Sequence, residues 1–429
     1  MTVVPSPALA QATTPPTPPA LQSAADPQRA RPTRSAVRGT VLRLCSVFEP
    51  PPEALARPDA AAYDPIGGMQ NHTAELTRGL DRLGVTQHVL TSRLGGPRSR
   101  TRLGRTATVV RTGARLRAVR QLWAADAVRE LARGTVPADL GLVHAHQGED
   151  LAVLPLAELV ARRAGVPLVV TLHCSVSRTV QARRGRPLAL VGPSVERSVV
   201  RRADAVLVLT ELAAEAAVED GADPARVHVV PSGFDPQLFA GPFDDPTPHV
   251  PHPRVLFAGR LADQKRPLDA VAAHALLGPE VHLVVVGDGP LRAQVQAAVA
   301  ASPARDRVHV VGLVPHEQVP AHLRHADVFV LPSQYEELGS VLVEAMASGL
   351  PVVANRVGGI PALVRDGVTG RLAERGDVAG LAAALSAALT DRRTTRRTSE
   401  AARAHVDTAY SWPVLAERVH DVYADVQRR

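Results

Sequence analysis

The chain has 429 residues, which is long for one hydrophobic core and indicates two domains with extensions. Aromatic residues make up 3%, which argues against base-stacking platforms for nucleic acid, and no apolar run is long enough to span a membrane. The net charge is +7. The two cysteines cannot form a disulfide framework, so a cytoplasmic location is expected.

The first 39 residues are rich in proline and alanine. They lack the basic start and continuous apolar core of a signal peptide, and we expect a disordered tail. Residues 40–48 are predicted to form the first strand. A proline-rich loop then leads to Gly67 and Gly68, which precede a helix running to about Leu83. Adjacent glycines before a helix leave backbone amides free for an anion, although a plain turn has the same composition.

An arginine-rich segment follows the second predicted strand, residues 85–91. Between Asp81 and Asp126 there are ten arginines and no acidic residue. A solvated, loop-rich surface is the simpler interpretation, and a face for an anionic membrane or an acidic partner is the alternative.

Residues 142–146 and 167–173 are predicted as parallel strands joined by a helix over 151–164. His144 and His146 share one strand face, but no third metal ligand is spaced convincingly, and no metal site is predicted. His173 ends its strand at the carboxyl edge, where α/β proteins form active sites. It is a candidate site residue, with a strand-capping histidine as the alternative. Strands over 203–210 and 227–230 complete this domain.

A polar, proline-rich linker is predicted over 241–253, and a second domain begins at Arg254. Its first strand leads to Gly259, and Arg260 and Lys265 stand in the loop that follows. Lys265 is the single lysine beside 48 arginines. A compact ammonium retained at one place suits a phosphate contact. The later Gly-Asp-Gly-Pro at 287–290 is a weak dinucleotide motif, because Arg292 replaces its third glycine.

The segment from Val328 to Ala354 predicts strand, loop, helix, turn and strand. Gly349 suits a left-handed helix end, and Pro351 prevents continuation. Glu336 lies in the loop before the helix, and Glu344 lies one turn after its start. If the first amides of the helix hold a phosphate, Glu344 can accept bonds from ribose hydroxyls. The alternative is that both glutamates only complement the helix dipole.

The pattern Glu336-x7-Glu344, continuing as Ala-Met-Ala-x-Gly-x-Pro-Val-Val-Ala, resembles the retaining GT-B glycosyltransferases of family four. The resemblance implies an α/β fold with two doubly wound Rossmann-like domains facing a cleft. The expected domains are an acceptor-side domain over 40–240, a nucleotide-sugar domain over 254–408, and a helix over 409–429 that crosses back to the first domain. The match covers most of residues 40–426.

The resemblance also implies residue roles. The glycine loop, Arg260 and Lys265 would meet the donor diphosphate, backbone near Leu313 the nucleobase, and Glu344 the ribose. The expected catalytic residues are Glu336, His173, Lys265 and Arg260. The expected donor-binding residues are Gly67, Gly68, Arg260, Lys265, Leu313, Val314, Glu336, Leu338, Gly339, Ser340, Val341 and Glu344. Ser232 departs from the family, which usually has asparagine there, so the role of its loop is left open.

The implied activity is transfer of a sugar from a UDP- or GDP-sugar with retention of anomeric configuration. The chain contains no Asp-x-Asp sequence, so we expect no metal and no cofactor. A front-face mechanism, with Glu336 and His173 orienting the sugar, is expected, and a covalent Glu336 intermediate is its rival. A nucleotide-sugar donor and a small-molecule acceptor are the expected partners, without nucleic acid; a homodimer is left open.

Phrases such as Gly67-Gly-Met-Gln70 and Leu172-His-Cys174 resemble actinomycete enzymes that glycosylate aminocyclitols in antibiotic pathways. An aminocyclitol or a thiol is therefore the expected acceptor. Three alternatives remain open: a hexosyl- or mannosyltransferase for a membrane lipid, a GT-B sugar-nucleotide epimerase, and a nucleotide-sugar-binding regulator without turnover.

Overall fold

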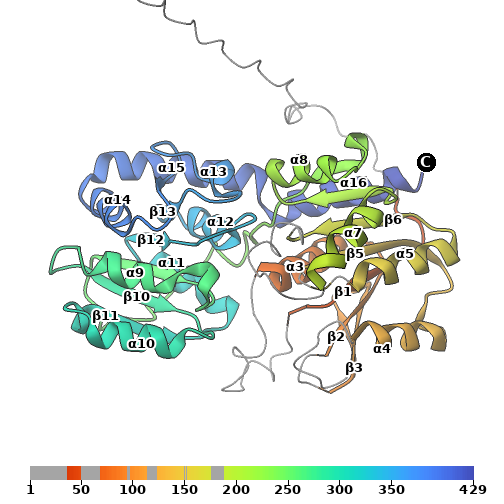
Figure 1. Cartoon of the computed structure of the whole chain (residues 1–429), viewed down its shortest axis with the longest axis horizontal. Helices are drawn as coiled ribbons and strands as arrows, with labels where there is room; N and C mark the ends of the chain where they lie inside the picture. The colour runs from red at the N-terminus through yellow and green to blue at the C-terminus, as the bar shows by residue number, and fades with distance from the viewer. Residues whose placement is uncertain are drawn as a thin grey trace, which may run out of the picture. The chain divides into compact units, whose positions relative to one another are not determined.

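The structure is a computed structural model. It describes residues 36–49, 68–93, 97–113, 123–148, 150, 152–174 and 188–429. The predicted tail over 1–39, apart from its last four residues, lies outside these ranges, as does Gly67. The described chain forms two sheets, one on each side of the predicted linker (Figure 1).

The first sheet has eight strands in the order β3-β4-β2-β1-β5-β6-β7-β8. All neighbouring strands are parallel except the antiparallel pair β3 and β4. The direction in which the chain winds reverses between β1 and β5, as in a doubly wound fold. The strands are β1 (Thr40–Cys45), β2 (Gln87–Ser92), β3 (Ser99–Leu103), β4 (Ala107–Thr112), β5 (Leu140–Gln147), β6 (Leu168–Leu172), β7 (Ala205–Val208) and β8 (Val227–Val229).

The two faces of this sheet carry different side chains because strand residues alternate. Leu42 and Leu44 pack with α4 and α5 on one face. Val41 packs on the other face with α3 and the C-terminal helix α16 (Trp412–Val426), and Arg43 shares its parity. The helices associated with this sheet are α3 (Gly68–Arg82), α4 (Trp123–Glu130), α5 (Val153–Ala164), α7 (Leu188–Val200) and α8 (Glu211–Glu219).

The second sheet is parallel throughout, in the order β11-β10-β9-β12-β13-β14. Its winding reverses between β9 and β12. Ligands of open α/β sheets bind beyond the carboxyl ends of the strands at this kind of reversal. The strands are β9 (Arg254–Ala258), β10 (His282–Val286), β11 (Val308–Gly312), β12 (Val328–Leu331), β13 (Val352–Asn355) and β14 (Arg371–Ala373).

Helices cover both faces of the second sheet. Leu256 and Phe329 pack with α12 and α15, whereas Val255 and Phe257 pack with α9, α10 and α14. These near-continuous apolar strands are typical of sheets buried on two sides. The helices are α9 (Pro267–His274), α10 (Arg292–Ala301), α11 (Val319–Arg324), α12 (Ser340–Ala347), α13 (Ile360–Leu363), α14 (Val378–Thr390) and α15 (Arg392–Ala409).

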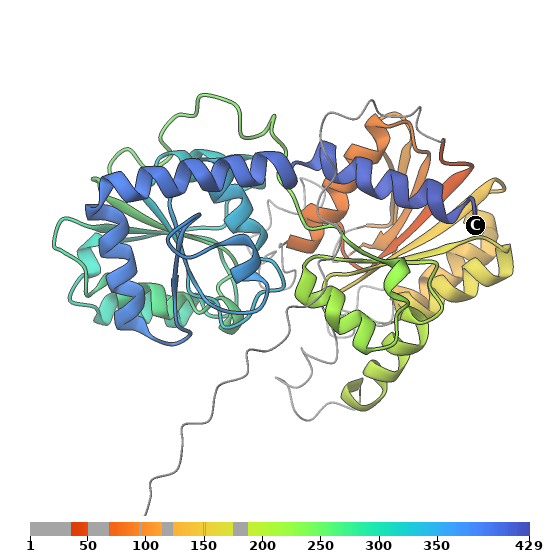
Figure 2. The same ribbon diagram turned by 90° about the horizontal axis from the view of Figure 1, so that it is seen from above.

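The last helix, α16 (Trp412–Val426), packs against α3 of the first sheet (Figure 2). A Cβ added at Gly79 of α3 would lie 2.6 Å from the Cβ of Ala416, so the glycine allows the two helices to approach closely. The expected return of the C-terminal helix to the first domain is confirmed by this contact.

The arginine-rich segment differs from expectation. Strands β3 and β4 form within it, and most of β4 is buried, so the prediction of a loop-rich surface was wrong there. Val109 and Val110 are among the buried residues of β4. Arg100 and Arg102 are exposed on β3 at the edge of the sheet. Charged side chains on an edge strand discourage pairing with another chain. Among the described residues, no helix combines the length and apolarity that a membrane crossing requires.

Candidate functional site

The loops after β9 and β12 meet at the reversal point of the second sheet. Lys265 comes from the first loop and Glu336 from the second. The Lys265 Nζ atom lies 2.6 Å from Glu336 Oε1. The hydroxyl of Ser333 donates to the same oxygen over 2.6 Å. Glu336 is 5% exposed, so this carboxylate is largely removed from water and held by two donors.

The loop that carries Glu336 ends at Gly339, immediately before α12. Gly339 has φ of 79°, a left-handed conformation that glycine adopts without the penalty of a Cβ. Leu338 anchors this loop in the core. Ser340 and Val341 follow as the first helical residues. Their N–H groups have no acceptor within the helix and form the positive end of its dipole.

Glu344 is 7% exposed and lies on α12. Its Oε1 atom is 3.1 Å from His316 Nε2. Burial is the largest single influence and lowers the pKa of His316, but Glu344, with smaller contributions from Glu75 and Glu317, raises the pKa above its ordinary value. Leu313 and Val314 are half-buried in the loop after β11 that leads to His316. The predicted ribose and nucleobase residues are thus connected through a histidine that sequence reasoning missed.

Two further predicted residues lie at this edge. Arg260 is half-buried directly after Gly259, at the carboxyl end of β9. Gly68 begins α3 of the first sheet, and a Cβ built on it would lie 2.9 Å from the Oγ atom of Ser340. Gly68 and the start of α12 are therefore neighbours. Gly67 lies outside the described residues.

His173 belongs to a cluster of buried histidines on the first sheet. Its Nε2 atom lies 3.2 Å from the Nδ1 atom of His146, and its ring centroid lies 4.5 Å from that of His72. His144 on β5 contacts Tyr423 of α16 and Thr171, and its ring centroid lies 4.1 Å from that of His146. Burial, followed by the charge of Arg43, lowers the pKa of His173 to about 3.

Sequence reasoning missed Arg43 and His72 in this cluster. Arg43 on β1, His144 and His146 on β5, and Thr171 on β6 all project from one sheet face, since each has the parity that faces α3 and α16. The strand order β1-β5-β6 makes them neighbours. His72 comes from α3, and its Nδ1 atom is 2.7 Å from the hydroxyl of Ser232. The available indication of this cluster was that polar residues occupy positions of the same parity on strands predicted to be buried.

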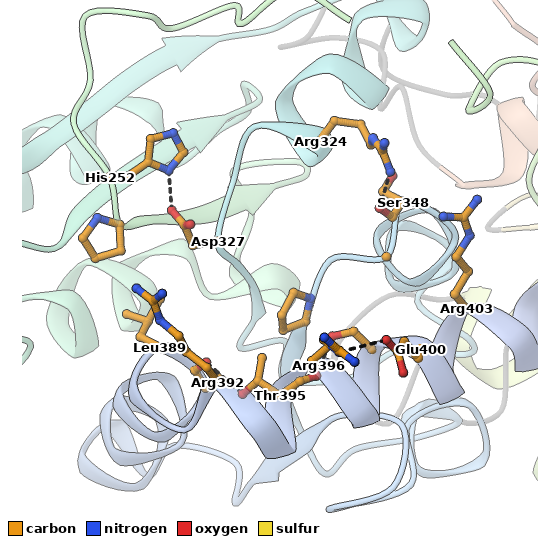
Figure 3. Close-up of a pocket in the computed structure, with 15 residues that line it drawn as sticks. His252, Arg324, Asp327, Ser348, Leu389, Arg392, Thr395, Arg396, Glu400 and Arg403 are labelled. Atoms are coloured by element: carbon orange, nitrogen blue, oxygen red, sulfur yellow. Dashed lines mark hydrogen bonds and ion pairs between the residues drawn. The ribbon is translucent and has the colours of Figure 1, made fainter. Parts of the chain in front are cut away.

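A cavity of about 770 Å³ lies elsewhere on the second domain (Figure 3). Its lining includes Pro253, Asp327 and Pro351, which precede β9, β12 and β13 at the amino edge of the sheet. The cavity is thus at the edge opposite Lys265 and Glu336. Two pairs lie within its wall, Arg396 with Glu400 and His252 with Asp327. We therefore do not assign the donor site to it.

Family models match most of the chain. The description "Glycosyltransferase Family 4" matches residues 66–238, and "Glycosyl transferases group 1" matches residues 245–405. The first match covers the first sheet except β1, and the second covers the whole second sheet, while α16 lies outside both.

Curated proteins of known activity resemble the chain over most of its length. A 2-deoxystreptamine glucosyltransferase of Streptomyces kanamyceticus is 36% identical over 344 residues, covering 73% of this chain and 87% of that protein. A 2-deoxystreptamine N-acetyl-D-glucosaminyltransferase of Streptomyces fradiae is 36% identical over 347 residues, covering 75% and 82%. The expected resemblance to actinomycete enzymes that glycosylate aminocyclitols is confirmed by these relatives.

Solved structures share the fold. A sucrose-phosphate synthase from Thermosynechococcus elongatus superposes with a TM-score of 0.77 at 23% identity, covering 90% of this chain and 99% of that chain. A glycosyltransferase involved in lipopolysaccharide biosynthesis gives a TM-score of 0.67 at 17% identity, covering 89% and 99%. The expected GT-B architecture is confirmed.

Proposed function

The chain belongs to the glycosyl transferases of group 1 and family 4, and we propose that it moves a hexosyl group from a nucleoside diphosphate sugar to an aminocyclitol with retention of configuration. The glycosyltransferase class follows from the family. The donor, the stereochemistry, the absence of a metal requirement and the acceptor are parts of the proposal.

The observation that carries the proposal is the contact between Lys265 and Glu336 at the reversal point of the second sheet. A donor diphosphate there would meet the ammonium of Lys265, the guanidinium of Arg260 and the amide end of α12. These are the positively charged and polarised groups that stabilise a departing diphosphate. No metal ion is needed in this scheme, because the chain's own cations would neutralise the phosphate charge.

In the proposed reaction the bond between the anomeric carbon and the phosphate oxygen breaks, and the acceptor oxygen bonds to the same face of that carbon. The acceptor's proton passes to the departing phosphate oxygen, so atoms and charge balance. Glu336 would orient the sugar hydroxyls. Two donors already hold its Oε1 atom, which lowers its nucleophilicity and favours the front-face route over a covalent Glu336 intermediate.

The acceptor class is proposed from the relatives. Two of them at 36% identity are described by action on 2-deoxystreptamine, and a D-inositol 3-phosphate glycosyltransferase of Xylanimonas cellulosilytica is 34% identical over 289 residues. Both acceptors named by these three relatives are cyclitols. We propose the amino-substituted ring rather than the phosphorylated one because the longer matches name it.

The test is a transfer assay with UDP-glucose, UDP-N-acetylglucosamine and GDP-mannose, each with 2-deoxystreptamine, with D-inositol 3-phosphate and without acceptor. Mass spectrometry and the anomeric proton coupling would identify the product. We expect an α-linked glycosyl aminocyclitol in the presence of EDTA. Product only with inositol phosphate, an epimerised donor without acceptor, or inverted configuration would contradict the proposal.

The nucleotide site has a separate test that does not depend on the acceptor. UDP, GDP, ADP and NAD are compared for thermal stabilisation, each with and without EDTA. A nucleotide at 100 times its dissociation constant should stabilise the folded protein by about 2.7 kcal/mol. We expect UDP or GDP alone to act and Lys265→Ala to abolish the shift. Stabilisation by NAD alone would contradict the glycosyltransferase proposal.

A further inference from the structure

Arg43 is a fully buried guanidinium that contacts only neutral acceptors in the described chain. Its Nη2 and Nε atoms lie 2.8 and 3.2 Å from His146 Nε2. Its Nη1 atom contacts the side chains of Thr77 and Gln87 and the Thr73 carbonyl. Burial lowers the pKa of Arg43, but guanidinium starts so far above neutrality that it remains charged in proteins.

This contact determines where His146 carries its proton. A guanidinium has donors and no acceptor, so His146 Nε2 must supply a lone pair. A neutral imidazole then carries its hydrogen on Nδ1, the atom that lies 3.2 Å from His173 Nε2. His146 therefore donates to His173, and His173 must accept on Nε2. By the same rule, the proton of His173 is placed on Nδ1.

The same geometry decides against a metal ion in this cluster. One ring nitrogen from each of His72, His146 and His173 lies within 4.8 Å of the others, an arrangement that resembles a three-histidine site. However, the Nδ1 atom of His146 has no lone pair to offer while Arg43 occupies Nε2. The charge of Arg43 would also repel a cation in a medium of low dielectric constant.

Titratable groups from β1, β5 and α3 surround His173. They are Arg43 from β1, His144 and His146 from β5, and His72 from α3, with Tyr423 of α16 in contact with His144. Burial is the largest cause and the charge of Arg43 the next in lowering the pKa of His173. The pKa values of His72, His144 and His146 are lowered as well, chiefly by burial.

We propose that Arg43 and His146 are positioning residues that fix the tautomer of His173, so that His173 presents an Nδ1–H donor to the substrate and cannot serve as a base. The role in transfer rests on the proposed function and on the contact of His173 with the donor sugar that the family resemblance implies. His173 then recognises an oxygen lone pair, such as that of a sugar hydroxyl. A substrate group that offers only a hydrogen has no acceptor on this ring.

The first measurement is ring nitrogen NMR of the full chain labelled with ¹⁵N-histidine, with His173→Gln identifying the His173 signals. We expect one neutral form between pH 5 and 8, protonated on Nδ1. A proton on Nε2, or titration near pH 6.5, would overturn the proposal. So would coordination of added Zn²⁺ by His146 and His173. This readout requires no turnover, so it is independent of the proposed reaction.

The second measurement compares His146→Asn with His146→Phe. The amide nitrogen of asparagine occupies about the place of Nδ1 and still donates to His173, whereas phenylalanine cannot. We expect kcat to fall about three- to tenfold in His146→Phe and to recover in His146→Asn, since one hydrogen bond of ordinary strength is lost. UDP affinity should stay unchanged in both variants. Equal kcat in the two variants would contradict the positioning role.

The two proposals fail in different ways. If UDP-sugar turnover is absent but His173 is protonated on Nδ1, the proposed function fails and the tautomer assignment stands. If turnover is present but His173 shows a mixture of tautomers, the proposed positioning role of Arg43 and His146 fails and the glycosyltransferase proposal stands. A His146→Phe variant that does not fold leaves the wild-type NMR spectrum to decide.

Discussion

The ammonium of Lys265 lies 2.6 Å from the carboxylate of Glu336, and the two residues are separated by 71 positions in the chain. The loops after β9 and β12 bring them together at the point where the winding of the second sheet reverses. At this point the cation and the carboxylate can each contact a different end of a sugar diphosphate. The charge of Lys265 suits the phosphates, and the oxygens of Glu336 suit the sugar.

Lys265→Ala should lower kcat about a hundredfold or more, because a preorganised cation for the departing phosphate is lost. Lys265→Arg should restore little of the lost kcat, since the planar guanidinium of arginine does not replace a compact ammonium. Steady-state kinetics of both variants check this, with Arg403→Met on α15 as a control that removes another ion-paired cation. Activity near the wild-type level in Lys265→Ala would reduce the contact to a structural ion pair.

Gly339→Ala should weaken binding of the donor nucleotide and lower stability. The left-handed backbone costs an L-residue about 1–2 kcal/mol, and the added Cβ would lie 3.2 Å from Leu342 Cδ1. Gly349→Ala is the matched control, because Gly349 at the other end of α12 is also left-handed but has open space around it. Isothermal titration with UDP and urea unfolding separate the effects. Both variants should lose stability, and only Gly339→Ala should lose affinity.

Stability should fall as the pH is lowered from about 6.5 toward 3. The pKa of buried His173 is lowered to about 3, and those of His72, His144 and His146 are lowered too. Below pH 6.5 the unfolded chain binds protons that the folded chain does not, so unfolding becomes more favourable. Each such histidine contributes up to about 1.4 kcal/mol per pH unit in this window.

Urea unfolding at pH 7, 6 and 5 measures that slope. His173→Gln should reduce the slope by at most one proton, because it removes one histidine whose pKa is lowered in the folded chain. A wild-type stability that does not change over this range would mean that the cluster is hydrated and protonated in the folded protein.

Tyr423→Phe should destabilise the first domain by about 1–3 kcal/mol, because it leaves the buried Nδ1 atom of His144 without its partner. The variant tests whether α16 is part of the cooperative unit of the first sheet. Tyr410→Phe is the control, since the hydroxyl of Tyr410 has no hydrogen-bond partner among the described residues. Differential scanning calorimetry would report the shift. Equal transition temperatures would indicate that α16 docks without contributing to stability.

Most of the order of elements could be predicted from the sequence. Apolar runs bounded by glycine and proline gave the strands near residues 40, 254 and 328, because fully buried parallel strands require continuous apolar residues. Strand β4 was missed because arginines surround its two valines. The family motif identified the residues around Glu336 and Glu344, since these are local in sequence.

The sequence by itself determined that Lys265 is singular, that Glu336 and Glu344 flank a helix start, and that His173 ends a strand. Only the tertiary structure decided which of these touch. Sheet order brings β9 beside β12 and β1 beside β5, so Lys265 meets Glu336, and Arg43 meets His146. The proposed proton position on His173, which directly follows β6, depends on Arg43 of β1 and His146 of β5. Such contacts follow from strand order and side-chain parity together, which no single stretch of sequence contains.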